Sequence, residues 1–280
     1  MPTSYTHYRF GQQVRELLPA DIQRVIDDHA DLFYIGLHGP DLLFYDIPFV
    51  RVIEVGNATH LRSGKDWFTH CGKILKKDKF DEEELAYLYG YMCHYALDRL
   101  CHGYINKVDA EGKVLHMEIE AELDAYYLKK DGYRPLTKKL TDHLHPSWHY
   151  AHVIQKFYPT LGTLNLYACL RGQVFWVNGL VMPDTLRGNL KRAGYYAILK
   201  LADSISPGAL KYYGLVINKK PNPLCEETNR ILDELYTSSM LQCVEFIQDF
   251  KDNVKGKQDW SPLFTVNFDG YETAVFEDED

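Results

Sequence analysis

Apolar residues recur at helical spacing along most of the chain. Val14, Leu17 and Leu18 share one face of a helix, and Pro19 followed by Asp21 predicts a break and the N-cap of a second helix. Further helical patterns, separated by Pro or Gly, cover residues 115–130, 148–158, parts of 161–180, 186–202 and 226–252. Alternating patterns typical of strands are scarce, so the sequence predicts an all-α fold.

One helix in the first half of the chain is apolar nearly all round. Asp81 precedes three glutamates at 82–84, which favour a helix N-terminus, and the run LAYLYGYMCHYALDRLCHGYI follows. Such a helix is typical of the middle of a domain. A hinge at 107–112 ends it. Residues 32–50 are apolar but interrupted by Gly and Pro, which predicts a loop around a short helical or extended piece.

The pattern indicates a single domain. Helical periodicity continues to about residue 260, and the chain then loses it and ends in FEDED. We therefore expect a multi-helix domain over 1–260 and an irregular acidic tail over 261–280, with its FEDED end in solvent. With 280 residues, 46% of them hydrophobic, the chain is long enough to bury a sizeable core.

Charge and composition exclude several classes of function. Lys and Arg number 31 against 39 Asp and Glu, and no polybasic run is present, so no stable nucleic-acid partner is expected. No basic segment followed by an apolar one opens the sequence, and nowhere do about 18 apolar residues run uninterrupted. We expect no transmembrane segment, a cytoplasmic location and six free cysteines.

All twelve histidines lie between His7 and His152. On the apolar helix, His94, Asp98 and His102 fall at i, i+4 and i+8, within an arc of roughly 80° on one face. The two histidines are about 12 Å apart along the axis, whereas zinc holds its ligands at roughly 2.0–2.2 Å. This spacing favours at least two metal ions with Asp98 between them.

His116 and Glu120 form another i, i+4 pair one connection later, able to face the first stripe across an antiparallel helix pair. A lone pair of this kind is usually an ordinary helix-stabilising contact. Here His94 and Asp98 lie in a stripe of Leu, Tyr, Met and Cys, where an unpaired charge would cost several kcal/mol. A bound cation would compensate that charge.

The string LYGYMCHYALDRLCHGY followed by LHMEIEAELDAYYL resembles the Hx₃D…H…Hx₃E core of the zinc-dependent phospholipase C family, whose helical fold is shared with S1/P1 nucleases. In that family three further ligands lie upstream. The matching positions here are His7 in SYTHYRFG, Asp41 in GLHGPDLLFY and His60 in GNATHLRSG.

The resemblance implies two or three zinc ions. The first would be held by Asp41, His60, His94 and Asp98, the second by His102, His116 and Glu120, and the third by His7 with Asp98. It also implies hydrolysis of a small-molecule or lipid phosphodiester by a metal-activated hydroxide, with Asp41 orienting or deprotonating the water.

The sequence departs from the family at three points. Secreted members supply an N-terminal tryptophan to the third zinc, whereas this chain begins Met-Pro-Thr. Leu42 replaces an aromatic residue of choline-lipid-cleaving members, and the membrane-binding β-sandwich of some toxins is absent, so insertion into bilayers is not expected.

Alternatives stay open for the function and for the remaining histidines. An S1/P1-like nuclease would use the same metals, and a non-catalytic zinc-binding scaffold would use them for folding alone. His143, His145, His149 and His152 are either ligands or pocket wall, or the polar start of a helix after Pro146. His38, beside Asp41, is a candidate to line the cleft.

Overall fold

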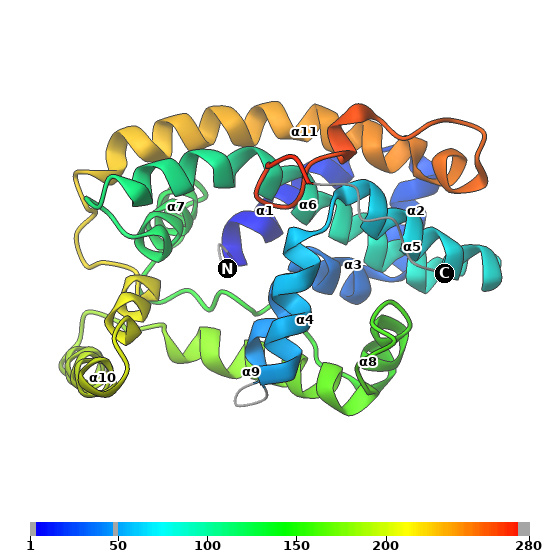
Figure 1. Ribbon diagram of the computed structural model, residues 1–280. Helices are drawn as coiled ribbons and strands as arrows, with labels where there is room; N and C mark the ends of the chain where they lie inside the picture. Colours follow the sequence, from blue (N-terminus) through cyan, green and yellow to red (C-terminus); the bar gives the residue numbers. More distant parts are fainter. Residues whose placement is uncertain (1–3, 47–49, 274–280) are drawn as a thin grey trace.

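Helix α6 (Glu82–Ala110) is the axis of the fold, with α11 (Cys225–Lys255) on one side and α3 (Ala30–Gly36) on the other (Figure 1). The helix begins where the glutamates at 82–84 predicted, and Asp81 caps it, because its side chain accepts hydrogen bonds from the backbone N–H groups of Glu83 and Glu84. From Glu84 to Ala96 every residue of α6 is buried. The absence of a polar face in the sequence therefore reflects burial on all sides.

The computed structural model describes residues 4–46 and 50–273, and this part of the chain is all-helical, with one isolated bridge between Val266 and Glu272. The other helices, in chain order, are α1 (Ser4–Leu17), α2 (Ala20–Asp28), the 3-10 helix η1 (Gly39–Tyr45), α4 (Val50–Leu61), α5 (Gly64–Lys77), α7 (His116–Lys130), α8 (Trp148–Gln155), α9 (Thr163–Gly179), α10 (Leu186–Ile205), and the 3-10 helices η2 (Ala209–Leu215) and η3 (Pro262–Phe264). No described helix is long and apolar enough to cross a membrane.

Helices α3 and α6 pack with their backbones in contact. A Cβ atom on Gly36 would lie 2.1 Å from the carbonyl oxygen of Tyr87, and one on Gly90 would lie 2.1 Å from that of Phe33. Only glycine fits at both positions. This close crossing fixes the part of α6 that comes just before His94.

The remaining helices pack around this axis. Helix α1 lies against α6, α7 and α11, and η1 packs against α4, α6 and α9. Helix α10 packs against η2, and η2 packs against α7, so these two helices extend one end of the molecule (Figure 1).

The described part of the C-terminal segment packs on the core. Phe264 and Phe268 are fully buried, and the hydroxyl of Tyr95 donates hydrogen bonds to the carbonyl oxygens of Leu263 and Val266 at 3.0 and 2.9 Å. Residues 261–273 therefore form part of the wall around α6. The acidic FEDED end lies outside the described residues.

Several boundaries differ from the sequence expectation. Pro19 occupies the N-cap position of α2, and Asp21 lies in its first turn. The segment predicted as a loop around a short piece contains α3 and η1, and α4 begins at its last residue, Val50. Helices α4 and α5 were not predicted.

Candidate metal centre

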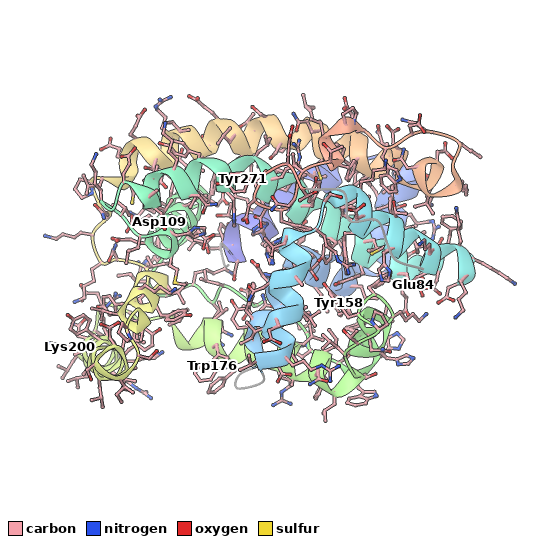
Figure 2. The ribbon with its side chains drawn as sticks, in the orientation of Figure 1. Glu84, Asp109, Tyr158, Trp176, Lys200 and Tyr271 are labelled. Carbon is pink, nitrogen blue, oxygen red and sulfur yellow. The ribbon has the colours of Figure 1, made fainter. Side chains whose placement is uncertain are left out.

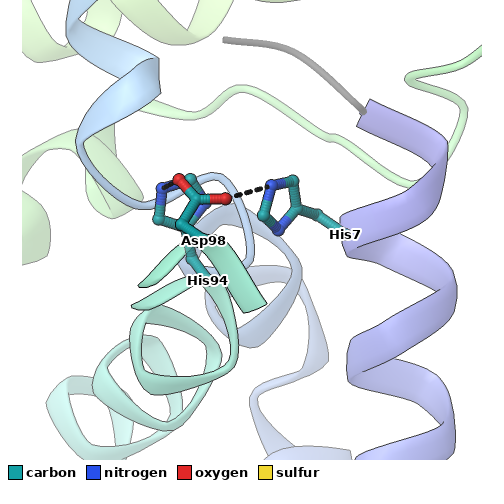
Figure 3. A group of neighbouring side chains, drawn as sticks. All are labelled: His7, His94 and Asp98. Carbon is teal, nitrogen blue, oxygen red and sulfur yellow. Dashed lines mark ion pairs between the residues drawn. The ribbon is translucent and has the colours of Figure 1, made fainter. Parts of the chain in front are cut away.

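His7, His94 and Asp98 meet at the middle of α6 (Figure 3). The Nε2 atom of His94 lies 3.0 Å from Oδ2 of Asp98, and Nε2 of His7 lies 3.1 Å from Oδ1. All three residues are buried. The carboxylate of Asp98 therefore lies between two imidazoles, and each of its oxygens faces one of them.

Helix α7 positions His7 from a distance. The carboxylate of Asp124 accepts hydrogen bonds from the backbone N–H groups of Tyr5 and Thr6, at 3.1 and 2.8 Å, and from the hydroxyl of Thr6 at 2.7 Å. A carboxylate at this place satisfies free donors in the first turn of α1 and favours its dipole. The N-terminal turn that carries His7 is thereby attached to α7.

Asp41 and His60 come from η1 and α4. Nε2 of His60 lies 3.0 Å from Oδ1 of Asp41, while Nδ1 of His60 donates to the carbonyl oxygen of Gly56 at 2.9 Å. That hydrogen bond leaves Nε2 with its lone pair available for a metal. Ligand atoms of Asp41, His60 and His94 all lie within 4.8 Å of one another.

Gly39 lets η1 pass directly over His94. Its φ is +48°, and a Cβ atom there would lie 2.2 Å from the His94 ring. Any other side chain would displace the imidazole or the segment that carries Asp41.

His102, His116 and Glu120 meet across the α6–α7 pair, as the sequence predicted. Oε1 of Glu120 lies 3.1 Å from Nε2 of His116 and 3.7 Å from Nε2 of His102, which is also 3.6 Å from Oδ1 of Asp98. Each of the two imidazoles is also oriented by a neighbour at Nδ1, the nitrogen that faces away from Glu120. Nδ1 of His116 lies 3.1 Å from Oδ1 of Asn106, and Nδ1 of His102 lies 2.9 Å from Oδ1 of Asp269. Such partners are typical of metal-binding histidines.

The donor atoms fit a metal better than they fit one another. Nε2 of His94 and Oδ2 of Asp98 are 3.0 Å apart and buried, yet within the described residues neither has a hydrogen-bond partner. Buried polar atoms are normally paired, so two that approach without bonding indicate a shared third partner. Mixed imidazole and carboxylate donors suit zinc.

The electrostatics of the pocket favour a cation. Burial acts to raise the pKa of Asp98, but the imidazoles of His94, His102 and His7 outweigh it and hold that pKa well below its usual range. For Asp41, burial is likewise outweighed, in part by His60 and His94. Conversely, Asp98 and Asp269 overcome burial and raise the pKa of His102 to about 9. The carboxylates of Asp41 and Asp98 are therefore ionised at neutral pH, and they stabilise positive charge in the pocket.

Comparison with known protein families shows to which family the chain belongs. The family model for zinc dependent phospholipase C matches residues 6–164. The chain belongs to the zinc-dependent phospholipase C family. It is therefore a zinc-dependent hydrolase of that family, and all eight candidate ligands lie inside the matched range. No curated protein and no solved structure matches the chain.

Four histidines that the sequence grouped do not converge in this phospholipase C family member. His145 pairs with Asp31, His149 pairs with Glu83, and His152 is exposed. His143 instead points inward, and its Nε2 lies 3.0 Å from Nε2 of His38. Burial lowers the pKa of His143 to about 3 and that of His38 well below its usual range, so both rings are neutral. They form a hydrogen-bonded pair, with one ring donating to the other.

Two residues of the C-terminal segment, outside the matched range, reach the centre of this family member. Asp269 contacts His102, and the ring of Phe268 lies 5.6 Å from that of His60 and 6.1 Å from that of His94. No spacing or motif near residue 269 points to the site. Only the folded chain brings these residues there.

Proposed function

We propose that the chain hydrolyses a phospholipid at the bond between phosphorus and the glycerol oxygen, releasing diacylglycerol and a phosphorylated head group. The observation that carries the proposal is the convergence of ligands from α1, η1, α4, α6 and α7 in three adjoining clusters: two share His94, and His102 of the third lies 3.6 Å from Asp98. The family supplies the substrate class, and the ionised carboxylates supply the charge that attracts zinc.

The proposed assignment of ligands is the one that the resemblance to the family implies, and the three clusters support it. Asp41, His60, His94 and Asp98 would hold one ion, His102, His116 and Glu120 a second, and His7 with Asp98 a third. Bound zinc supplies Lewis acidity, which lowers the pKa of water toward about 7 and stabilises charge on phosphoryl oxygens. His94 belongs both to the cluster with Asp41 and His60 and to the cluster with His7 and Asp98. These two clusters therefore adjoin each other.

Asp41 is the residue we propose to orient the attacking water. Its carboxylate is ionised at neutral pH, and it lies on η1, directly over His94. An ionised carboxylate accepts a hydrogen bond from water and can take up its proton. Leu42, the next residue, is 1% exposed and packs in the hydrophobic core.

The role of Asp41 is tested by Asp41→Asn. We expect the variant to keep much of its zinc and lose most of its turnover, because an amide can still coordinate through oxygen but cannot accept a proton. Asp46→Asn is the matched control, since Asp46 is equally buried at the end of the same helix and accepts a hydrogen bond from Asn165. Full turnover by Asp41→Asn would contradict the role.

The substrate class is tested on the purified, zinc-loaded chain with nitrophenyl phosphorylcholine, phosphatidylinositol and single-stranded DNA. Turnover of the phosphorylcholine ester or the lipid supports the proposal. Turnover of DNA alone would make the chain a nuclease of the S1/P1 kind, and stable zinc without any turnover would make it a scaffold.

A further inference from the structure

Helix α10 turns an apolar face to solvent. Leu186, Leu190, Leu201 and Ile205 are 79%, 66%, 67% and 80% exposed. At about 100° per residue these positions share one side of the helix, and Ala193 and Ala197, also exposed, fall between them. A surface helix normally carries polar residues on its outer side, so this face needs an explanation beyond folding.

The opposite side of α10 accounts for its attachment to the protein. A Cβ atom on Gly188 would lie 1.9 Å from the carbonyl oxygen of Pro183, and the guanidinium of Arg192 donates to the carbonyl oxygens of Met182 and Ile217 at 3.3 and 3.1 Å. The hydroxyl of Tyr195 donates to the carbonyl oxygen of Tyr212 in η2. The outer leucines take no part in these contacts.

Positive charge is concentrated around the same helix. Residues 181–224 contain seven Lys or Arg and two Asp, a net charge of +5, so the rest of the chain carries −13 (−8 minus +5). Arg187 and Lys191 flank the apolar face on one side and Lys200 flanks it on the other, and all three are exposed. An apolar stripe between basic edges is typical of a helix that lies in the interface of an anionic membrane.

Two aromatic side chains near the end of the preceding helix are also exposed. Phe175 and Trp176, near the end of α9, are 68% and 46% exposed and pack edge to face with ring centroids 5.0 Å apart. Trp176 and Lys200 both lie in the lower part of Figure 2. Tryptophan is favoured at the boundary between lipid head groups and acyl chains.

We propose that α10 is an interfacial helix that docks the protein on a bilayer containing anionic phospholipid, an inference that rests on the proposed phospholipid substrate. The leucine face enters the boundary between head groups and acyl chains, and the flanking Arg187, Lys191 and Lys200 meet lipid phosphates. The helix is about 30 Å long, and it lies on the surface without crossing the membrane.

The fold connects this docking face to the metal centre. Helix η2 packs on the start of α7, where Gly214 approaches Glu118, and the side-chain amide of Asn218 donates to Glu118 and Glu122 at 2.9 Å each. Helix α7 carries His116 and Glu120. Docking through α10 therefore holds the ligand-bearing helix at a fixed distance from the lipid surface.

The test is sedimentation of the full-length chain with vesicles of phosphatidylcholine, with and without phosphatidylserine. We expect binding that increases with phosphatidylserine and weakens with salt. The double variant Leu190→Glu/Leu201→Glu should bind at least about tenfold more weakly, because it loses two apolar anchors and gains two like charges. Leu241→Glu is the matched control, since Leu241 is 69% exposed on α11, and it should bind as the parent does.

Turnover of a short-chain phospholipid below its aggregation concentration separates this proposal from the proposed function. Equal monomer turnover by the parent and the double variant, with vesicle binding lost only in the variant, supports docking through α10. Vesicle binding through α10 without monomer turnover supports docking while the proposed function fails. Monomer turnover without vesicle binding, or a dimer in gel filtration that only the double variant abolishes, would overturn the docking proposal.

Discussion

Asp269 accepts a hydrogen bond from Nδ1 of His102 at 2.9 Å, although 167 residues separate the two in sequence. The contact depends on a tight C-terminal loop. Oδ1 of Asn267 accepts from the backbone N–H groups of Asp269 and Tyr271, and Gly270, with φ of +78°, packs on the carbonyl oxygen of Arg99. The last described segment thus orients a candidate ligand on α6.

We expect Asp269→Asn to weaken zinc binding about 10–100-fold, because a carboxylate behind a metal-binding imidazole fixes its tautomer and raises its basicity. Competition with a chromogenic chelator measures the affinity without any substrate. Asp259→Asn, an exposed carboxylate two residues before the C-terminal segment, is the control. Equal zinc affinity in both variants would show that the contact has no effect on the metal.

Substitution of the glycine at the α3–α6 crossing should destabilise the whole fold. In Gly90→Ala the new methyl would meet the carbonyl oxygen of Phe33 at 2.1 Å, so α3 must move, at a cost of about 1–3 kcal/mol or more in free energy of unfolding. Gly103→Ala, further along α6, has open space around it and should stabilise by about 0.5–1 kcal/mol. Urea unfolding of both variants measures the difference, and similar free energies would refute the close crossing.

Glu84 should make stability depend on pH. Burial is the main reason that its pKa is raised from 4.5 to about 7, against the opposing ammonium of Lys156 at 2.5 Å. Because its pKa is higher in the folded state, Glu84 contributes fully to the free energy of unfolding below pH 4.5, its pKa in the unfolded chain. That contribution is lost as the pH rises through about 7.

The glutamine in Glu84→Gln does not titrate. The free energy of unfolding of the parent should therefore fall by about 1–3 kcal/mol relative to that of this variant between pH 4.5 and pH 7. Lys156, whose pKa is raised, stays charged throughout this range. The free energy of unfolding of both proteins across the range provides the check. Two parallel curves would mean that Glu84 is ionised at its ordinary pKa.

The sequence predicts best where the physical signal is local. Helix α6 was predicted because its apolar run and the glutamates at its N-terminus are contiguous, and the His94, Asp98 and His102 stripe followed from helix geometry alone. Helix α4 was missed because Val50, Val52 and other β-branched residues with Gly56 lower its helix propensity, and packing against η1 overrides that propensity.

Long-range features could not be predicted from spacing. Nothing near Asp269 or Asp124 marks them as partners of His102 and of α1, because both contacts arise only when distant segments fold together. His143 was grouped with its neighbours in sequence, whereas the turn after Leu140 directs it inward to His38. The apolar period of α10 predicted the helix correctly but could not show that its leucines face solvent.

The central claim is that eight side chains from distant segments hold zinc in one pocket, and anomalous X-ray diffraction at the zinc absorption edge tests it most directly. We expect two or three peaks, one among Asp41, His60, His94 and Asp98, one among His102, His116 and Glu120, and any third between His7 and Asp98. Crystals of zinc-loaded protein with no peak at these residues, or with zinc bound only elsewhere, would contradict the account.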